Sequence, residues 1–173
     1  MSERELAATV RDAAAKVRLL ILDVDGVMTD GRLHYGPDGA EFKSFNVRDG
    51  LGMKQAQRAG IEVAIISGRG GEAVERRLQE LGIRHVLLRQ KDKRAALDRL
   101  LDQLGVGLDE VACVGDDTPD LAIMQPCALG ITVADAHPEV LAVADWTTSL
   151  GGGRGAVREV CDLLVSIRGA RGD

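Results

Sequence analysis

The chain has 173 residues, a length that fits one domain and allows a buried core without disulfides or structural metals. Hydrophobic residues make up 45% of it but aromatic residues only 2%, so the core must consist of Ala, Val, Ile and Leu, which favours an α/β protein over a β-sandwich. Lys and Arg number 22 against 27 Asp and Glu, and the net charge of -5 argues against nucleic acid as a partner.

The first residues are charged at positions where a signal peptide would need an unbroken apolar segment, namely Glu3, Arg4, Glu5, Arg11 and Asp12. No apolar run approaches the roughly 18 residues of a membrane span. The cysteines are widely spaced, without a Cys-x-x-Cys pair, and indicate buried reduced thiols. They are Cys113, Cys127 and Cys161. We expect a cytoplasmic protein with one domain over residues 1–173 and no membrane association.

A short amphipathic helix is predicted near the amino terminus by apolar residues at helical spacing between Leu6 and Val17. The strand that follows, residues 17–24, contains Leu19-Leu20-Ile21-Leu22 and is apolar on both faces, which is typical of a strand covered by helices on each side. The turn sequence Gly36-Pro37-Asp38-Gly39 then predicts a β-hairpin over residues 31–45.

From residue 49 onward, helical and strand patterns alternate. The predicted helices cover residues 49–60, 72–81, 91–104, 118–124, 138–144 and 156–167, and the predicted strands cover residues 61–66, 85–88, 111–114 and 128–133. This alternation predicts an α/β fold with a Rossmann-like, doubly wound and mainly parallel sheet. The hairpin would form a flap, and residues 168–173 a carboxyl-terminal tail.

Polar clusters follow the predicted strands where each one ends, which is where open α/β sheets bind ligands. They are Asp23 and Asp25, then Ser67-Gly68-Arg69, then Lys91 and Lys93, then Asp116, Asp117 and Asp120. Residues two apart in an extended segment point the same way, so Asp23 and Asp25 can both face one reacting centre.

Five aspartates at one edge of the sheet would repel each other strongly unless a cation lay among them. An all-oxygen ligand set favours a hard ion such as Mg²⁺. The cation would attract phosphate, and Ser67 with a lysine would hold the non-bridging phosphoryl oxygens. The sequence therefore predicts magnesium-dependent chemistry on a phosphate group.

Each motif also has an ordinary structural explanation. Asp-x-Asp-Gly occurs in turns and calcium loops, although an EF-hand needs a ligand where this chain has Val27. Ser67-Gly68-Arg69 fits a plain strand-to-helix turn, the two lysines fit a solvated helix start, and Asp116-Asp117 fits a helix cap. Four such motifs in this order, each at a predicted strand end, favour the catalytic interpretation.

The motifs resemble those of the haloacid dehalogenase superfamily of phosphotransferases, in which they would be Asp23-Val24-Asp25-Gly26, Ser67, a lysine near position 93, and Gly115-Asp116-Asp117-Thr118-Pro119-Asp120. Further segments are similar to the family of 3-deoxy-D-manno-octulosonate 8-phosphate phosphatases, which act in making the Kdo sugar of lipopolysaccharide. These segments are residues 23–30, 45–50, 133–138 and 151–159. The resemblance covers nearly the whole chain and implies hydrolysis of a small sugar acid phosphate.

The resemblance also implies a role for each motif residue. Asp23 would attack phosphorus and form an aspartyl phosphate, while Asp25 would protonate the leaving oxygen and then take a proton from water. Mg²⁺ would be held by the Asp23 side chain, the Asp25 backbone carbonyl and Asp116. Asp117 and Asp120 would complete or orient that set of ligands.

Two lysines compete for the third motif, because the segment reads Arg89-Gln90-Lys91-Asp92-Lys93. We favour Lys93, which better matches the family's position just inside the helix, and Lys91 stays the alternative. Arg48, Arg69 and Arg154 are candidates for the substrate's carboxylate or hydroxyls, because guanidinium offers a planar fork. The alternative for Arg154 is a flexible linker, since it lies in a glycine run.

The spacing of the motifs leaves no room for a separate cap domain. The family implies a homotetramer in which the hairpin and the carboxyl-terminal tail of neighbouring subunits help close each site. The hairpin has apolar side chains that would be costly to leave in water, namely Leu33, Tyr35, Phe42 and Phe45. Other readings are a phosphatase for a related nine-carbon sugar acid phosphate, a sugar phosphate mutase, or a non-catalytic assembly domain.

Overall fold

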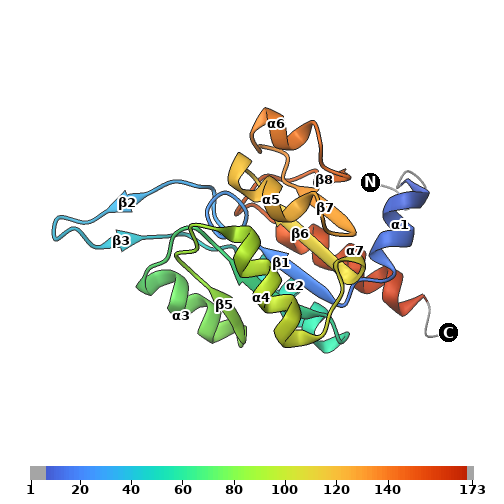
Figure 1. The fold of residues 1–173 in the computed structure, drawn as a ribbon. Helices are drawn as coiled ribbons and strands as arrows, with labels where there is room; N and C mark the ends of the chain where they lie inside the picture. Colours follow the sequence, from blue (N-terminus) through green and yellow to red (C-terminus); the bar gives the residue numbers. More distant parts are fainter. Residues whose placement is uncertain (1–6, 171–173) are drawn as a thin grey trace.

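The computed structural model describes residues 7–170, which form a parallel sheet with helices on both faces (Figure 1). The sheet has the strand order β5-β4-β1-β6-β7-β8, and every neighbouring pair is parallel. Its strands are β1 (Leu19–Leu22), β4 (Glu62–Ile66), β5 (His85–Leu87), β6 (Val111–Gly115), β7 (Leu129–Thr132) and β8 (Trp146–Thr147). The expected doubly wound α/β fold is confirmed.

The helices form two layers, each packed on an apolar face of the sheet. One layer contains α1 (Ala8–Ala14), α2 (Val47–Arg58), α3 (Glu72–Leu81) and α7 (Ala156–Gly169). The other contains α4 (Lys93–Leu104), α5 (Leu121–Met124) and α6 (Pro138–Leu141), with 3-10 turns η1 (Leu108–Glu110) and η2 (Thr118–Asp120) between elements. Strand β1 is buried on both sides because Leu20 and Leu22 pack in the first layer and Leu19 and Ile21 in the second.

The central strand β1 determines where a ligand can bind. The chain places β4 and β5 on one side of β1 and then crosses back to place β6 on the other side. The reversal opens a crevice beyond the carboxyl ends of β1 and β6. The ladder continues one residue past β1, where the Asp23 amide donates to the Val114 carbonyl at 3.1 Å. Asp23 therefore leaves the sheet at this crevice.

Side-chain caps explain two helix starts that differ from the expected ones. Helix α2 begins at Val47 because the Asn46 side chain accepts the Arg48 amide at 2.8 Å. Helix α4 begins at Lys93, two residues later than predicted, because the Asp92 carboxylate caps it by accepting the Ala95 amide at 2.9 Å.

Other differences lie in the carboxyl-terminal half. The predicted helix at 118–124 is divided into η2 and α5, and the two-residue strand β8 was not predicted. Helix α7 continues to Gly169, so the expected tail at 168–173 begins inside a helix, and its last three residues lie outside the described residues.

The expected hairpin is present as β2 (His34–Tyr35) and β3 (Glu41–Phe42), and it projects from the body of the molecule (Figure 1). The exposed fractions are 63% for Tyr35 and 58% for Phe42, whereas Phe45 is partly buried and packs against the core. The described chain adds no separate cap domain to the sheet, its helices and this flap.

Residues 151–155 form a packed turn rather than a flexible linker. The Gly153 amide donates to the Val27 carbonyl at 3.0 Å, and the Gly152 amide donates to the Asp135 carboxylate at 2.9 Å. This turn holds the loop that follows β1 in place.

The cysteines Cys113, Cys127 and Cys161 are buried and unpaired, as expected. Among the described helices, none has both the length and the apolar character that crossing a membrane requires.

Gly152→Ala is expected to disturb the loop at residues 26–30, because the added Cβ would lie 1.7 Å from the Gly26 carbonyl oxygen. Overpacking of this kind should lower the free energy of unfolding by about 1–3 kcal/mol, measured by urea denaturation. The control is Gly169→Ala, whose Cβ would have no neighbour within 4 Å. Equal stability of the two variants would contradict the close packing described here.

Candidate active site

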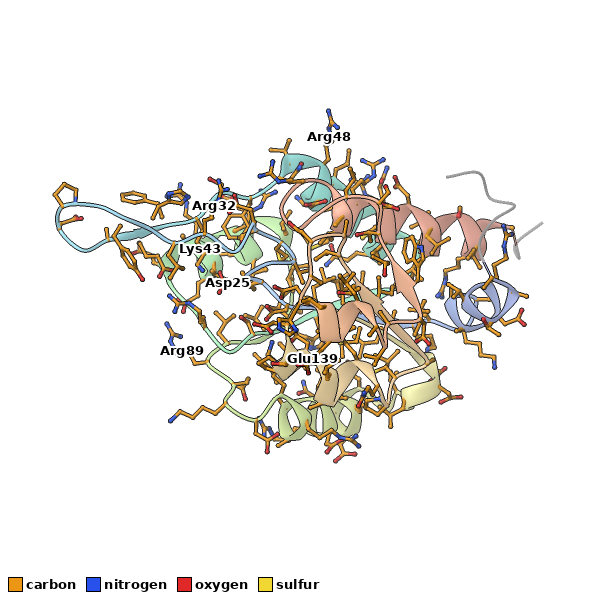
Figure 2. All side chains as sticks on the ribbon, turned by 90° about the horizontal axis from the view of Figure 1, so that it is seen from above. Asp25, Arg32, Lys43, Arg48, Arg89 and Glu139 are labelled. Carbon is orange, nitrogen blue, oxygen red and sulfur yellow. The ribbon has the colours of Figure 1, made fainter. Side chains whose placement is uncertain are left out.

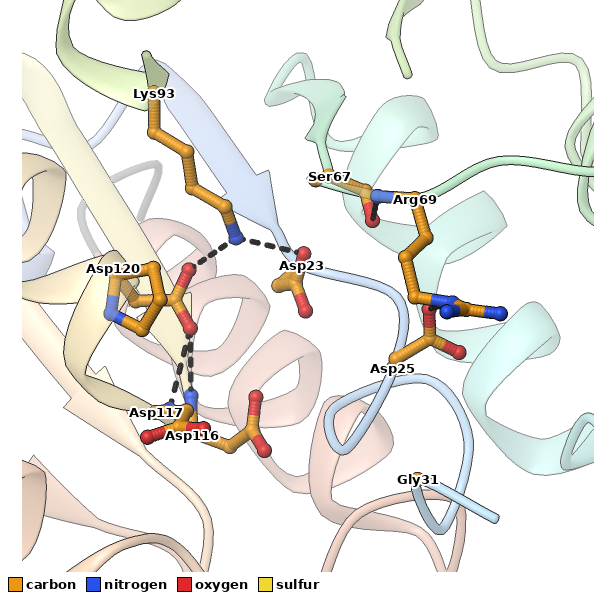
Figure 3. A pocket seen from close by; sticks show the side chains of 11 residues that line it. Asp23, Asp25, Gly31, Ser67, Arg69, Lys93, Asp116, Asp117 and Asp120 are labelled. Carbon is orange, nitrogen blue, oxygen red and sulfur yellow. Dashed lines mark hydrogen bonds and ion pairs between the residues drawn. The ribbon is translucent and has the colours of Figure 1, made fainter. Parts of the chain in front are cut away.

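A cavity of about 340 Å³ lies beyond the carboxyl ends of β1 and β6 (Figure 3). It collects side chains from all four predicted motifs. Its lining consists of Asp23, Asp25, Gly31, Ser67, Gly68, Arg69, Lys93, Asp116, Asp117, Pro119 and Asp120. The sheet topology thus brings together groups that lie far apart in the sequence.

Asp23 and Lys93 form the buried centre of this cavity. The Lys93 Nζ atom lies 2.9 Å from Asp23 Oδ1 and also donates to Asp120 Oδ1 (Figure 3). The exposed fractions are 7% for Asp23, 8% for Lys93 and 2% for Asp120. Lys93 reaches this position because it is the first residue of α4, directly after the Asp92 cap.

Asp120 connects this centre to the loop after β6. Its Oδ2 atom accepts the backbone amides of Asp116 at 3.1 Å and Asp117 at 3.3 Å, while its Oδ1 atom faces Lys93. The Asp117 side chain caps η2 by accepting the Thr118 amide at 2.7 Å. Asp120 therefore fixes the backbone that presents Asp116 to the cavity.

The cavity carries more negative than positive charge. Burial raises the pKa of Asp23 to about 6, although the adjacent Lys93 opposes the rise. Burial also raises the pKa of Asp116 to about 8, and the carboxylates of Asp23, Asp120 and Asp117 add to this effect. For Lys93, burial lowers the pKa, but Asp23 and Asp120 outweigh burial and raise it. One ammonium group does not neutralise this cluster.

The donor set fits a hard divalent cation. One carboxylate oxygen from each of Asp23, Asp116 and Asp120 lies within 4.8 Å of the other two. All three groups offer oxygen atoms, which Mg²⁺ prefers, and a cation beside them would lower the raised pKa values of Asp23 and Asp116. The Asp25 side chain is not part of this cluster. Asp120 is part of it, although the sequence suggested only an orienting role for that residue.

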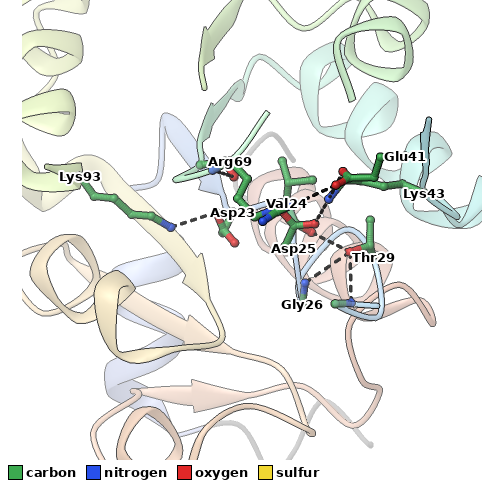
Figure 4. Close-up of polar contacts among 11 residues, drawn as sticks. Asp23, Val24, Asp25, Gly26, Thr29, Glu41, Lys43, Arg69 and Lys93 are labelled. Atoms are coloured by element: carbon green, nitrogen blue, oxygen red, sulfur yellow. Dashed lines mark hydrogen bonds and ion pairs between the residues drawn. The ribbon is translucent and has the colours of Figure 1, made fainter. Parts of the chain in front are cut away.

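The Asp25 carboxylate lies on the other side of the cavity, facing the flap (Figures 3 and 4). Its Oδ1 atom pairs with Lys43, and its Oδ2 atom lies 3.7 Å from Arg69 Nε. Glu41 completes the group by accepting from Arg69 Nη2 at 2.7 Å. Sequence reasoning missed Lys43 and Glu41, because it considered only the apolar residues of the hairpin. The alternation Glu41-Phe42-Lys43, which puts both charges on one face, was the available signal.

Of the remaining candidate residues, Ser67 and Arg69 line the cavity of Asp23, and Lys91, Arg48 and Arg154 do not. Ser67 is 1% exposed and lines the cavity together with Arg69. Lys91 is exposed and lines an adjoining cavity. Arg48, which points outward in Figure 2, and Arg154 are both exposed and are not among the described residues that line the cavity of Asp23.

Known proteins with similar sequences show the family of this chain. A family model described as haloacid dehalogenase-like hydrolase matches residues 85–151. The 3-deoxy-D-manno-octulosonate 8-phosphate phosphatase KdsC of Escherichia coli strain K12 is 49% identical over 164 residues, which are 95% of this chain and 87% of that protein. This chain belongs to the 3-deoxy-D-manno-octulosonate 8-phosphate phosphatase family.

Solved structures of this family share the fold. The 3-deoxy-D-manno-octulosonate 8-phosphate phosphatase of Yersinia pestis is 47% identical with a TM-score of 0.93, and the match covers 94% of this chain and 88% of that one. The enzyme of the same name from Moraxella catarrhalis was solved with a magnesium ion, a phosphate ion and a KDO molecule. It is 42% identical with a TM-score of 0.89, and the match covers 91% of each chain.

Gly26→Ala is expected to weaken cation binding. Gly26 has a φ of +91°, and a Cβ there would lie 1.9 Å from Asp116 Oδ2, so the carboxylate would have to move. We expect at least tenfold weaker Mg²⁺ binding by titration calorimetry, a loss typical of a disturbed metal ligand. Gly82→Ala is the matched control, since Gly82 also has positive φ (+68°) but open space around its Cβ. An unchanged affinity in Gly26→Ala would mean that Asp116 does not contribute to the site.

Proposed function

We propose that this protein is a magnesium-dependent phosphatase that converts 3-deoxy-D-manno-octulosonate 8-phosphate to the sugar acid and inorganic phosphate. The observation that carries this proposal is the Asp23–Lys93–Asp120 cluster beside Asp116, at the crevice where β1 and β6 meet. It occurs in a chain that is 49% identical to a protein named for this activity. The buried free cysteines agree with a cytoplasmic location, where thiols stay reduced.

The proposed reaction uses the two aspartates after β1 in different roles. Asp23 attacks the phosphorus atom while the bond to the sugar oxygen breaks, and Asp25 gives its proton to that oxygen. Water then attacks the phosphorus of the aspartyl phosphate, Asp25 takes its proton, and Asp23 is released. Lys93 and Ser67 hold the non-bridging oxygens, where negative charge is concentrated during transfer.

Asp23, Asp116 and the backbone carbonyl of Asp25 would hold Mg²⁺, with Asp120 and Asp117 orienting them. The ion would supply positive charge for the phosphoryl group and keep Asp23 ionised. Asp120 suits an orienting role because Lys93 and two backbone amides already engage its oxygens. Arg69, at the cavity wall, would contact the sugar acid.

A folded Asp23→Asn protein should lose activity by at least about a thousandfold, because an amide is a very poor nucleophile. Phosphate release is measured with Mg²⁺ across a panel of eight- and nine-carbon sugar acid phosphates.

Chelation should abolish the activity of the wild-type protein, and added Mg²⁺ should restore it. Full turnover in excess chelator would refute the metal role, and a preference for the nine-carbon substrate would reassign the sugar.

The complete site is proposed to form in a homotetramer in which each chain contributes one domain. Support comes from the flap, whose Leu33, Tyr35 and Phe42 are exposed and would form an apolar patch on a monomer. Arg154 is also exposed, on a turn that Gly152 and Gly153 fix to the body. In closed symmetry each subunit would both lend and receive these parts, and Arg48 and Arg154 would then reach the substrate of a neighbouring site.

Mixing two inactive variants tests whether the subunits share sites. The Asp23→Asn variant lacks the nucleophile, and the Arg154→Ala variant lacks the arginine that would reach a neighbouring site. In a mixed tetramer some sites combine Asp23 from one subunit with Arg154 from its neighbour. Random mixing should restore about a quarter of wild-type activity if each site uses one neighbour's arginine. Light scattering checks the assembly. Mixed tetramers without recovered activity would mean that Arg154 acts within its own subunit, and a fully active monomer would exclude sharing.

A further inference from the structure

Four charged groups meet where the flap joins the cavity (Figure 4). Lys43 Nζ pairs with Asp25 Oδ1 and lies 3.3 Å from Glu41 Oε1. Arg69 Nη2 lies 2.7 Å from Glu41 Oε2, and Arg69 Nε lies 3.7 Å from Asp25 Oδ2. Two acidic and two basic side chains thus form a closed ring of ion pairs, of which the Asp25 carboxylate is one member.

Lys43 is the most buried member of this ring. Its side chain is 1% exposed, against 19% for Asp25, 22% for Glu41 and 50% for Arg69. A lysine is costly to bury and is retained where charged partners compensate it. The two partners of Lys43 are Asp25, from the loop after β1, and Glu41, from β3. The ammonium group therefore joins the flap to that loop.

The two aspartates after β1 each have a lysine of their own. Lys93 holds Asp23 from α4, and Lys43 holds Asp25 from the flap (Figure 4). Lys43 engages Oδ1 of Asp25, whereas Oδ2 lies 3.7 Å from Arg69 Nε, beyond hydrogen-bond distance, so Oδ2 is the oxygen that can carry a proton.

We propose that Lys43 is a positioning residue that holds the Asp25 carboxyl group in the orientation needed for proton transfer. This inference rests on the proposed function, because it assigns a proton-transfer role to Asp25. Asp25 Oδ2 gives its proton to the departing sugar oxygen as the phosphorus–oxygen bond breaks, while Lys43 fixes Oδ1. Glu41 and Arg69 complete the ring, so Asp25 reaches its working orientation only with the flap in place.

The test compares substrates that differ in their need for an acid. A sugar phosphate leaves as an alkoxide that must be protonated, whereas the nitrophenolate of p-nitrophenyl phosphate leaves without a proton. Lys43→Met should lower kcat/KM by about 10- to 100-fold for the sugar acid phosphate, since general acid catalysis is worth about 10²- to 10⁴-fold. For p-nitrophenyl phosphate we expect a change of less than about threefold.

Three further measurements separate positioning from a structural role. Lys43→Arg keeps a cation and should recover part of the lost rate. Adding Lys43→Met to Asp25→Asn should cost less than about threefold more, because residues that act as a unit are not additive. Lys54→Met, which removes an exposed lysine on α2, should match the wild-type protein.

The outcomes are distinct. Equal losses on both substrates would assign Lys43 to flap packing alone and overturn the inference, as would wild-type kinetics in Lys43→Met. Wild-type protein that releases no phosphate from any sugar phosphate would instead overturn the proposed function. Circular dichroism of each variant shows whether it is folded, and a Lys43→Met protein that does not fold leaves Lys43→Arg and the two-substrate comparison to decide.

Discussion

The crowding of carboxylates at the end of β1 and β6 is the constraint on which the site depends. Parallel pairing of these strands puts Asp23 and Asp116 at one crevice, and the fold must then offset their repulsion. Lys93 supplies a buried positive charge, and Asp120 is tied to it and to two backbone amides. Such a cluster is stable in the absence of a cation only where its neighbours hold it rigidly, which the fully buried aliphatic strands do.

Charge compensation also divides the site into two halves. The half toward α4 and β6 is buried, acidic and suited to a cation and a phosphoryl group. The half toward the flap is more exposed, and there acids and bases are balanced in number. In the proposed mechanism, two aspartates with the same side chain would therefore act as nucleophile and as acid, because their surroundings differ.

Much of the fold could be predicted, because buried parallel strands and amphipathic helices give strong local patterns. Strand β8 could not be, since two residues carry no periodicity and pair only because β7 offers a free edge. The position of the four motifs followed from strand order. The ring around Asp25 did not, because Lys43 finds its partner through the path of the flap rather than through sequence spacing. Arg48 is a separate case, because α2 turns its side chain outward, and this orientation depends on how the helix packs.

The close packing of Gly152 against the Gly26 carbonyl affects the order in which the site forms during synthesis of the protein. The loop after β1 leaves the ribosome long before the turn that supports it, at residues 151–155, has been synthesised. Strand β1 pairs with β4 on one edge, and its other edge stays unpaired until β6 has been synthesised. Contacts of such long range form late, so a nascent chain carries Asp23 without a complete site until residues 151–155 have been synthesised.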